Sequence, residues 1–339
     1  MKATVIEHYG EDNVKLENID IPKINDDQVL IKVVGASINP IDLKTAEGKL
    51  KFLLPYKMPL TLGSDFSGIV AEIGKDVSTF AIGDEVYGRV RKDMLGTFAE
   101  YLVVDPSIMT KKPEISTFQE AAALPLVSLT SYQALHDVMK IKAGDKILIQ
   151  AGAGGIGTVA IQLAKLAGAY VATTSSQKNI SFLKNLGADE VIDYHKDDFS
   201  ELLTDYDYVF DTMGGEILDK SFKILRKGGM IVSISGVPDL GFAKSYGLPY
   251  WKKLALKIAT RKIRRLEKEY QVAYHFLFMK PSGEQLEVIR SFVENKQLTP
   301  ILDLSFPLVD IKKSFDYSAK GHVRGKVTID ISDEDFLKK

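Results

Sequence analysis

The sequence lacks cysteine entirely, in a chain of 339 residues. This absence excludes disulfide bonds, a catalytic thiolate and every zinc site built on cysteine. Histidine occurs only five times, at His8, His136, His195, His275 and His322. None of these histidines stands at a spacing typical of metal ligands. We therefore expect no metal site and assign the histidines to the surface or to packing.

The chain also lacks a strong charge of one sign and a long apolar run. Its formal net charge of −1 gives no overall field that would attract nucleic acid or an anionic membrane. No apolar stretch approaches the roughly 20 residues needed to cross a bilayer, and the N-terminus does not resemble a secretory signal. With the missing cysteines, these features predict a cytoplasmic protein without a transmembrane segment and without a nucleic-acid partner.

Hydrophobic periodicity divides the chain into two regions. Residues 1–124 contain short apolar or alternating runs punctuated by Gly, Pro and Asp, which is typical of a small antiparallel barrel or sandwich. From residue 125 onward, strand-like runs alternate with helical patterns, and this alternation predicts a doubly wound parallel sheet. Among the later elements we expect a helix over 216–229, a basic and mostly helical stretch over 240–272, and a strand over 274–279.

A glycine-rich turn, AGAGGIG, stands between a predicted strand and a predicted helix. It contains the pattern G-x-G-x-x-G, in which the first glycine permits a tight turn and the second lets the backbone approach a pyrophosphate. The third glycine lets the helix pack closely on the strand, and the helix N-terminus binds the phosphate. An ordinary glycine-rich turn is the alternative. The expected phosphate-binding residues are Gly152, Gly154, Gly155, Ile156 and Gly157.

The end of the next strand indicates which nucleotide the turn would bind. A site for NAD typically carries an acidic residue there, which binds the ribose 2′-hydroxyl. In this chain the strand ends without a carboxylate; Ser175 and Ser176 supply hydrogen-bond donors and Lys178 supplies a cation. This set favours the 2′-phosphate of NADPH. A polar strand end followed by a solvated lysine is the alternative.

Longer stretches of the sequence resemble a known family. The glycine-rich turn with its helix, LGADEVIDY at 186–194 and GKVTID at 325–330 are similar to the medium-chain dehydrogenase/reductase superfamily. Within this superfamily, SINPIDLKTAEG at 37–48, PLTLGSDFSGIVAEIG at 59–74 and AAALPLVSLTSYQAL at 121–135 resemble the zinc-free branch of quinone oxidoreductases and enone reductases. The resemblance covers essentially the whole chain.

The resemblance implies an α/β fold with two domains. A GroES-like β-barrel catalytic domain is expected over 1–124, completed by about 280–339, and a doubly wound Rossmann domain that binds NADPH is expected over 125–279. Zinc-dependent members of the superfamily carry a cysteine where this chain has Asn39, and Gly-His-Glu where it has Gly63-Ser64-Asp65. We therefore expect a zinc-independent enzyme.

Without a metal to polarise it, the substrate must already be electrophilic if it is to accept a hydride. Quinones and α,β-unsaturated carbonyl compounds meet this requirement. The predicted function is therefore an NADPH-dependent oxidoreductase that transfers hydride to such substrates. A reductase restricted to enones or alkenals is the first alternative. A nucleotide-binding protein with a structural or RNA-contacting role is the second.

The resemblance also implies roles for individual residues beside the nicotinamide. Asn39 and Lys44 would donate hydrogen bonds to a substrate oxygen on which negative charge develops, and Asp42 would orient these donors. The alternative for this segment is a turn that simply starts a helix. Thr130 is expected to start the first helix of the nucleotide domain, as a cap or as a nicotinamide contact. The other expected cofactor contacts are Tyr194, Thr212, Ser235, Gly236, Phe278 and Met279.

Two segments bear on partners. The strand expected at 274–279 would lie at the outer edge of the parallel sheet, and pairing of this edge with its own copy predicts a homodimer. The basic stretch at 251–268 is expected to be a solvated helix face over the substrate cleft. A peripheral contact with an anionic membrane or with nucleic acid is the alternative for this stretch.

Overall fold

The computed structural model describes residues 1–10, 13–52 and 54–332, which form two compact units. Unit 1 combines Met1–Leu129 with the segment that starts at Lys280, and unit 2 is the continuous segment Thr130–Met279. The sequence analysis placed the boundary between residues 124 and 125. Within the expected C-terminal segment 280–339, residues 333–339 lie outside the described residues.

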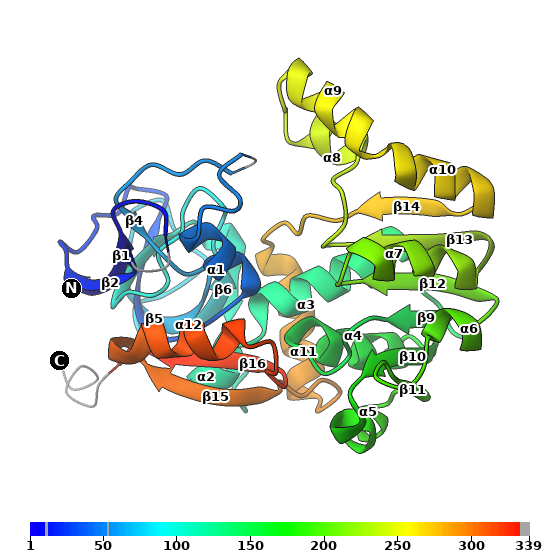
Figure 1. The fold of residues 1–339 in the computed structure, drawn as a ribbon. Helices are drawn as coiled ribbons and strands as arrows, with labels where there is room; N and C mark the ends of the chain where they lie inside the picture. Colours follow the sequence, from blue (N-terminus) through cyan, green and yellow to red (C-terminus); the bar gives the residue numbers. More distant parts are fainter. Residues whose placement is uncertain (11–12, 53, 333–339) are drawn as a thin grey trace. The chain divides into compact units, whose positions relative to one another are not determined.

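Unit 1 is built on two β-sheets (Figure 1). Its strands are β1 Lys2–Ile6, β2 Lys15–Asn18, β3 Val29–Ser37, β4 Leu60–Thr61, β5 Asp65–Ile73, β6 Glu85–Arg89, β7 Tyr101–Val104, β8 Met109–Lys111, β15 Leu302–Pro307 and β16 Lys326–Asp330. The smaller sheet has the order β2-β1-β4. The larger sheet has the order β15-β16-β3-β5-β6-β8, and β7 also pairs with β3. This mainly antiparallel arrangement agrees with the β-rich pattern of the sequence.

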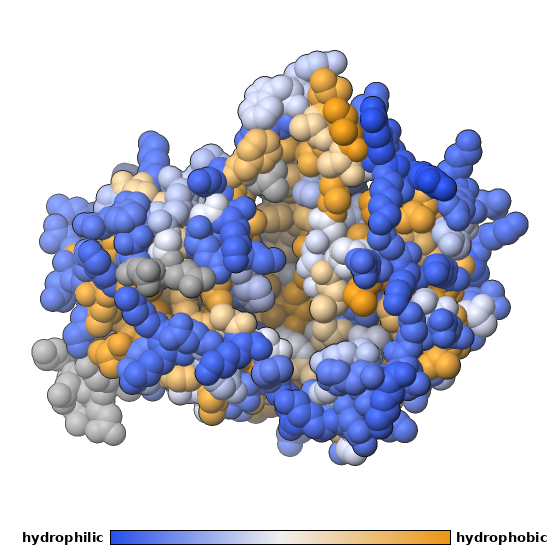
Figure 2. Space-filling model, viewed as in Figure 1, coloured by the Kyte–Doolittle hydropathy of each residue, from blue (hydrophilic) through white to orange (hydrophobic). Residues whose placement is uncertain are grey.

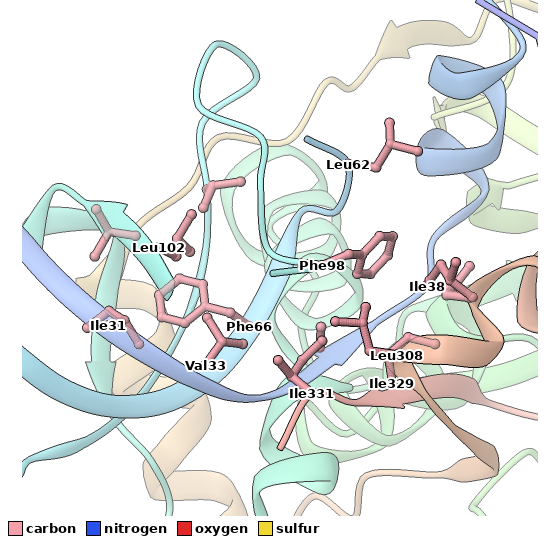
Figure 3. Packing of buried hydrophobic residues seen from close by; sticks show 14 of the residues in the cluster. Ile31, Val33, Ile38, Leu62, Phe66, Phe98, Leu102, Leu308, Ile329 and Ile331 are labelled. Atoms are coloured by element: carbon pink, nitrogen blue, oxygen red, sulfur yellow. The ribbon is translucent and has the colours of Figure 1, made fainter. Parts of the chain in front are cut away.

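The core of unit 1 joins residues from both ends of the chain (Figure 3). Ile31 and Val33 of β3 lie in the same apolar cluster as Phe66 of β5 and Ile329 of β16. Phe98, from the segment before β7, belongs to this cluster as well. Each of these side chains is fully buried. Because β16 lies between β15 and β3, the C-terminal segment completes the sheet and its core. Burial of such side chains contributes roughly 1.5–3 kcal/mol each.

Five α-helices among the residues described belong wholly or partly to unit 1. They are α1 Pro40–Ala46, α2 Phe118–Ala122, α3 Pro125–Tyr132, α11 Gly283–Glu294 and α12 Ile311–Ala319. Helix α1 follows β3 directly, and Pro40 occupies its first position, where the missing N–H removes no helical hydrogen bond. Helix α3 begins in unit 1 and ends in unit 2, which explains why the alternation of strands and helices starts before the unit boundary.

Unit 2 is a doubly wound parallel sheet, as the sequence predicts. Its strands are β9 Lys146–Ile149, β10 Tyr170–Ser175, β11 Glu190–Asp193, β12 Tyr206–Asp211, β13 Leu225–Ser233 and β14 Ala273–Phe276. Their order, β11-β10-β9-β12-β13-β14, starts in the middle and steps outward to both sides, which is the Rossmann order. The α-helices are α4 Gly155–Leu166, α5 Ile180–Asn185, α6 Phe199–Leu202, α7 Gly215–Ser221, α8 Leu240–Ser245, α9 Tyr250–Ala259 and α10 Arg261–Tyr270.

The helix expected over 216–229 is shorter than the sequence pattern suggested. Helix α7 ends at Ser221, a short 3-10 turn follows, and β13 already begins at Leu225. Gly228 has a φ of 79°, which no right-handed helix accommodates. The apolar residues Ile224 and Leu225, which looked like part of a helical stripe, are instead buried where the chain enters the sheet. The helical pattern of this stretch was therefore misleading.

The outer strand β14 has a covered edge. The N–H of Leu277, just beyond the strand, donates to the Ser233 carbonyl on the β13 side at 2.9 Å. The alternate N–H groups of Tyr274 and Phe276 instead donate to carboxylates, to Glu267 Oε1 at 2.9 Å and to Asp239 Oδ2 at 3.0 Å. These two donors therefore already have partners within the chain.

Within the residues described, no helix is both long enough and apolar enough to cross a bilayer.

Candidate functional site

The glycine-rich turn lies between β9 and α4, with Gly154 as the N-cap of the helix. A Cβ on Gly157 would lie 2.5 Å from the Ala151 carbonyl oxygen, and a Cβ on Gly152 would overlap the Thr173 hydroxyl. Close packing therefore requires glycine at these two positions. A Cβ on Gly154 would meet only the Ala151 carbonyl oxygen, at 3.5 Å.

No contact within the chain therefore requires glycine at position 154. Its φ of −77° suits any residue, and its surroundings leave room for a side chain. Open space in front of a glycine at a helix N-terminus is what a closely approaching phosphate requires. The N–H groups of Gly155, Ile156 and Gly157 open the helix, and such first-turn groups have no carbonyl partner within it. The turn therefore fits the pyrophosphate of a dinucleotide.

The end of β10 gathers polar groups next to this turn. Ser175 is buried and its Oγ donates to the Ser176 carbonyl at 3.1 Å, whereas Lys178 is exposed. A second cation, which the sequence analysis missed, joins them from the loop after β11. Lys196 Nζ donates to Gln177 Oε1 at 3.0 Å. The parallel pairing of β10 with β11 brings these two loops to the same sheet edge.

Tyr194 lies at the same edge. Its N–H donates to the Ser175 carbonyl at 3.2 Å, and its ring stacks at a tilt on His195 with centroids 4.3 Å apart. The ring is 57% exposed, although it is large and apolar. The predicted contacts Ser175, Lys178 and Tyr194 thus come together around one strand end.

Two further predicted contacts meet at the ends of β12 and β13. Ser235 Oγ donates to the Thr212 carbonyl at 2.8 Å, and Thr212 Oγ1 donates to the Gln150 carbonyl at 3.1 Å. The N–H of Gly236 donates to Ser233 Oγ at 2.8 Å. Ser233 Oγ in turn donates to the fully buried Asp211, a residue that the sequence analysis did not single out.

The remaining predicted contacts have different surroundings. Thr130 lies inside α3, which starts at Pro125, so the expectation that it starts a helix as a cap was wrong. The Phe278 ring contacts the rings of Phe242 and Tyr246, with centroids 5.8 and 5.2 Å away. Met279 is half-buried. The Phe278 side chain therefore packs against other aromatic rings, so only the backbone of this residue is available to contact a ligand.

In unit 1, seven buried polar side chains form one hydrogen-bonded group that we call the polar cluster. Its members are Ser37, Asn39, Asp42, Ser64, Asp65, Arg89 and Lys326. They come from β3, α1 and the residue before it, β5 and the residue before it, β6 and β16. The cluster holds two carboxylates and two cations, so its formal charges cancel. Balance matters because an unpaired charge in a buried site is strongly unfavourable.

Asn39 lies at the centre of the polar cluster. Its Nδ2 donates to Asp65 Oδ2 at 2.9 Å, and its Oδ1 accepts a hydrogen bond from Lys326 Nζ at 2.5 Å. Lys326 Nζ also donates to the Ile38 carbonyl at 2.7 Å. A carboxylate on one side and an ammonium on the other determine which way the amide of Asn39 points. One of its two amide hydrogens has no partner among the described residues.

Asp65 connects most of the polar cluster. Its Oδ2 accepts from Ser37 Oγ at 3.1 Å and lies 3.8 Å from Lys326 Nζ. Its Oδ1 accepts from the Leu126 N–H at 3.1 Å and lies 3.7 Å from Arg89 Nε. The carboxylate is fully buried. Arg89 and Lys326 therefore both lie close to the carboxylate of Asp65.

Asp42 is the second acid. Its carboxylate accepts from the Asn39 N–H at 2.8 Å and from Ser64 Oγ at 2.7 Å. Burial raises the pKa of Asp42 to about 6, although the Ser64 hydrogen bond and the Arg89 charge oppose this shift. Burial likewise lowers the pKa of Lys326, against the raising effect of the Asp65 and Asp42 charges.

The three predicted catalytic residues therefore do not form a single group. Asn39 and Asp42 belong to the polar cluster, whereas Lys44 lies on the exposed face of α1. Arg89 and Lys326 were not predicted. The alternating pattern of KVTID groups Lys326 with the polar Thr328 and Asp330, so the sequence gives no local signal that this lysine is buried. No group of three or more His, Cys, Asp or Glu side chains suited to a metal ion occurs in the described part of the chain.

Comparison with known proteins agrees with this geometry. Residues 25–114 match the alcohol dehydrogenase GroES-like domain, and residues 186–329 match a family described as zinc-binding dehydrogenase. The chain is 34% identical to the NADPH-dependent alkenal/one oxidoreductase of Arabidopsis thaliana, over 97% of this chain and 79% of the relative. It is 32% identical to the quinone-oxidoreductase homologue of Spinacia oleracea, over 95% of each.

A solved structure leads to the same family. The quinone oxidoreductase from Coxiella burnetii is 34% identical, with a TM-score of 0.84, covering 98% of this chain and 99% of that one. The zinc-binding name belongs to the family model that matches residues 186–329, a range that does not include Asn39 and Ser64. With its GroES-like unit, its Rossmann unit and these relatives, the chain belongs to the quinone oxidoreductase branch of the medium-chain dehydrogenase/reductase superfamily.

Proposed function

We propose that this protein is a zinc-independent, NADPH-dependent reductase of quinones and α,β-unsaturated carbonyl compounds. The observation that carries the proposal is the polar cluster. At the positions where zinc-dependent relatives hold their metal, the Asn39, Ser64 and Asp65 side chains are hydrogen-bonded to other members of the cluster. The names of two relatives, an alkenal/one oxidoreductase and a quinone-oxidoreductase homologue, support the substrate class.

In this proposal Asn39 donates a hydrogen bond to the substrate oxygen. NADPH supplies the hydride when it is bound. Lys326 holds Oδ1 of Asn39 and Asp65 holds one amide hydrogen, which leaves the second hydrogen for the substrate. A donor fixed in advance stabilises the developing negative charge without reorganisation. Lys326 and Asp65 act as positioning residues for this donor.

Asp42 and Lys44 have smaller proposed roles. The Asp42 carboxylate accepts the Asn39 N–H and so fixes the start of α1. We propose that it positions Asn39. Lys44 projects from the exposed face of the same helix, and we propose it as a second donor to the substrate oxygen, in this case a cationic one.

The proposed cofactor is NADPH. Its pyrophosphate would rest on the turn at Gly154 and on the N–H groups that open α4. Its 2′-phosphate would meet Ser175, Ser176, Lys178 and Lys196 at the end of β10. In this proposal Tyr194 packs against the adenosine and Thr130, Thr212, Ser235, Gly236, Phe278 and Met279 line the path of the nicotinamide half. Two lysines and two hydroxyls favour a phosphate dianion over the hydroxyl of NADH.

The reaction is tested by NADPH consumption with a simple quinone, an alkenal and a cyclic enone. We expect turnover with the quinone and at least one unsaturated carbonyl compound. Asn39→Ala should lower kcat by roughly 10²-fold with an unchanged NADPH affinity, because the donor acts on the transition state. Ser67→Ala, which alters a buried hydroxyl of β5 outside the polar cluster, is the control and should keep its kcat.

Two outcomes would count against the proposal. Absence of turnover with all three substrates, despite NADPH binding, would favour a nucleotide-binding protein with a structural or RNA-contacting role. Wild-type kcat in Asn39→Ala would remove Asn39 from the mechanism. A reductase restricted to alkenals or enones is the second candidate function, supported by the alkenal/one oxidoreductase relative. Turnover of the alkenal and the enone, with none of the quinone, would establish it.

Cofactor choice is tested separately. We expect the KM for NADPH to be at least tenfold below that for NADH, since a charge-assisted phosphate contact contributes about 1.5–3 kcal/mol. Lys178→Ala and Lys196→Ala should each reduce the preference, and together they should remove it. Lys184→Ala, on the exposed side of α5, is the matched control. Equal KM values in the wild type would refute the assignment.

We also propose a cytoplasmic homodimer that forms through the edge of β14. Pairing there must displace the Glu267 and Asp239 carboxylates from the Tyr274 and Phe276 N–H groups, so the dimer is expected to be weak. Glu267→Gln should tighten it and Phe276→Pro should abolish it, as measured by sedimentation at micromolar concentration. A wild type that stays monomeric, and stays so in Glu267→Gln, would reject the dimer.

A further inference from the structure

Helix α9 is unusual because it buries none of its residues. Four of its large side chains, three apolar and one tyrosine, are instead open to solvent. The exposed fractions are 81% for Tyr250, 58% for Trp251, 49% for Leu254 and 52% for Ile258. A helix on a soluble protein normally turns such side chains toward the core. Figure 2 shows apolar residues at the top of the view, where Figure 1 draws α8 and α9.

The exposed apolar residues form a stripe along one side of α9. Tyr250, Leu254 and Ile258 follow one another at intervals of four residues, and Trp251 lies beside them. The half-buried Leu256 comes two residues after Leu254, about half a turn away. The apolar stripe is therefore the outward face, and only the opposite face approaches the rest of unit 2.

Basic residues are concentrated along α9 and α10. Two of the cations have acidic partners within the chain, since Lys262 pairs with Asp219 and Arg265 lies 4.0 Å from Glu269. The basic residues from 252 to 268 are Lys252, Lys253, Lys257, Arg261, Lys262, Arg264, Arg265 and Lys268. The one acid in this range, Glu267, accepts the Tyr274 N–H, and its side chain is half-buried. The whole chain has a net charge of −1, so the excess of cations is local to α9 and α10.

We propose that α9 and α10 form an interfacial anchor that binds the surface of an anionic lipid bilayer. The stripe of Tyr250, Trp251, Leu254 and Ile258 would enter the headgroup region, and the flanking lysines and arginines would meet lipid phosphates. Helices with one apolar face, aromatic residues and a basic border bind bilayers in this way. Tyr and Trp suit the boundary between water and acyl chains, and the long stems of Lys and Arg reach back to it.

Charge and shape favour a bilayer over other partners. Single-stranded RNA would use the cations and the aromatic rings, but nothing in RNA matches the aliphatic Leu254 and Ile258. A second copy of this face, placed about a two-fold axis, would bring two predominantly cationic surfaces together, and these would repel each other. An anionic bilayer offers both the apolar interior and the opposite charge.

Trp251 provides a direct test because it is the single tryptophan of the chain. The full-length protein is mixed with vesicles of equal parts phosphatidylglycerol and phosphatidylcholine. We expect a blue shift of tryptophan emission, quenching by lipids brominated near the headgroup end of their chains, and co-sedimentation with the vesicles. Vesicles of phosphatidylcholine alone should bind much more weakly, and salt should reduce the binding.

Two pairs of variants separate the contributions of charge and apolar contact. Lys257→Gln with Arg261→Gln should weaken partitioning by roughly 25-fold, at about fivefold for each cation near the surface. Leu254→Ser with Ile258→Ser should weaken it at least tenfold. The matched controls are Lys51→Gln with Lys320→Gln and Ile82→Ser with Val309→Ser, which alter exposed residues of unit 1 and should leave partitioning unchanged.

Three outcomes would overturn the proposal. The first is tryptophan emission that no vesicle changes. The second is an emission shift that follows protein concentration without lipid, because that result assigns the face to a second copy of the chain. The third is binding of single-stranded RNA that persists in Leu254→Ser with Ile258→Ser while vesicles are not bound. NADPH affinity, measured on the same samples, shows whether each variant is folded.

Discussion

The glycine-rich turn of unit 2 and the polar cluster of unit 1 are built in opposite ways. The turn uses consecutive residues and works through the side chains that it lacks, since a Cβ at Gly157 would overlap the backbone. The cluster uses side chains from distant segments, and Asp65 meets both cations only because the sheet assembles. Adding a methyl group to the turn at Gly157 should therefore destabilise the protein, and so should removing one side chain from the polar cluster.

The largest expected effect breaks the charge balance of the polar cluster. Lys326→Met leaves Asp42 and Asp65 buried with Arg89 as their one cation. Removing one partner of a buried pair typically costs about 3–5 kcal/mol of unfolding free energy, so urea unfolding should shift to a much lower concentration. Lys313→Met, at a lysine that is 71% exposed on α12, should change stability by less than about 0.5 kcal/mol.

A double variant sharpens the same comparison. Asp65→Asn combined with Lys326→Met leaves one acid and one base, and should be less destabilised than the sum of the single variants. Residues that share a network typically show coupling of about 0.5–3 kcal/mol. Strict additivity, or a Lys326→Met variant as stable as Lys313→Met, would mean that the cluster is not coupled.

The next effect depends on pH. The folded state raises the pKa of Asp42 from 3.8 to about 6, so protonated Asp42 contributes stability that is complete below pH 4. This contribution is lost as pH rises through about 6, where the buried carboxyl ionises. Relative to the wild type, Asp42→Asn should therefore gain up to about 3 kcal/mol of unfolding free energy between pH 4 and pH 7. A difference that stays constant over this range would contradict the pKa shift.

The smallest expected effect on stability concerns the turn. Gly157→Ala should lower the unfolding free energy by about 1–3 kcal/mol, because the methyl group meets backbone atoms that cannot move aside. Gly154→Ala should be stable to within about 0.5 kcal/mol but bind NADPH at least tenfold more weakly. Thermal unfolding and cofactor titration measure the two quantities. Normal NADPH binding by Gly154→Ala would show that no phosphate group of the cofactor binds at this position.

The same difference explains how much of the fold the sequence predicts. The parallel sheet of unit 2 is predictable because each strand and helix carries its own period, and their alternation is typical of a doubly wound sheet. The helix expected over 216–229 was partly wrong because Ile224 and Leu225 continue a helical stripe up to Gly228. Local pattern cannot distinguish a helix end from the start of a buried strand when both are apolar.

The residues of the candidate site also divide into those that local sequence reveals and those that only the tertiary structure brings together. The glycines proposed to bind phosphate are visible from their spacing, and Lys178 from its position at the end of a predicted strand. Lys196 was missed because only the pairing of β10 with β11 brings its loop next to Gln177. Lys326 was missed for a similar reason, since its partner Asn39 lies at the other end of the chain. Tertiary proximity of this kind leaves no local spacing to read.

The position of β16 between β15 and β3 has a consequence for synthesis on the ribosome. Unit 2 is one continuous segment and can fold as soon as residue 279 has emerged. The sheet of unit 1 and its polar cluster must wait for Lys326, about 260 residues after Asp65. At roughly 5–20 residues per second, this delay lasts on the order of 13–50 s. Over the last 47 residues of that interval, from residue 279 to Lys326, the nascent chain carries a finished unit 2 together with an open sheet whose acids lack one of their cations. At the same rate this stage lasts roughly 2–9 s.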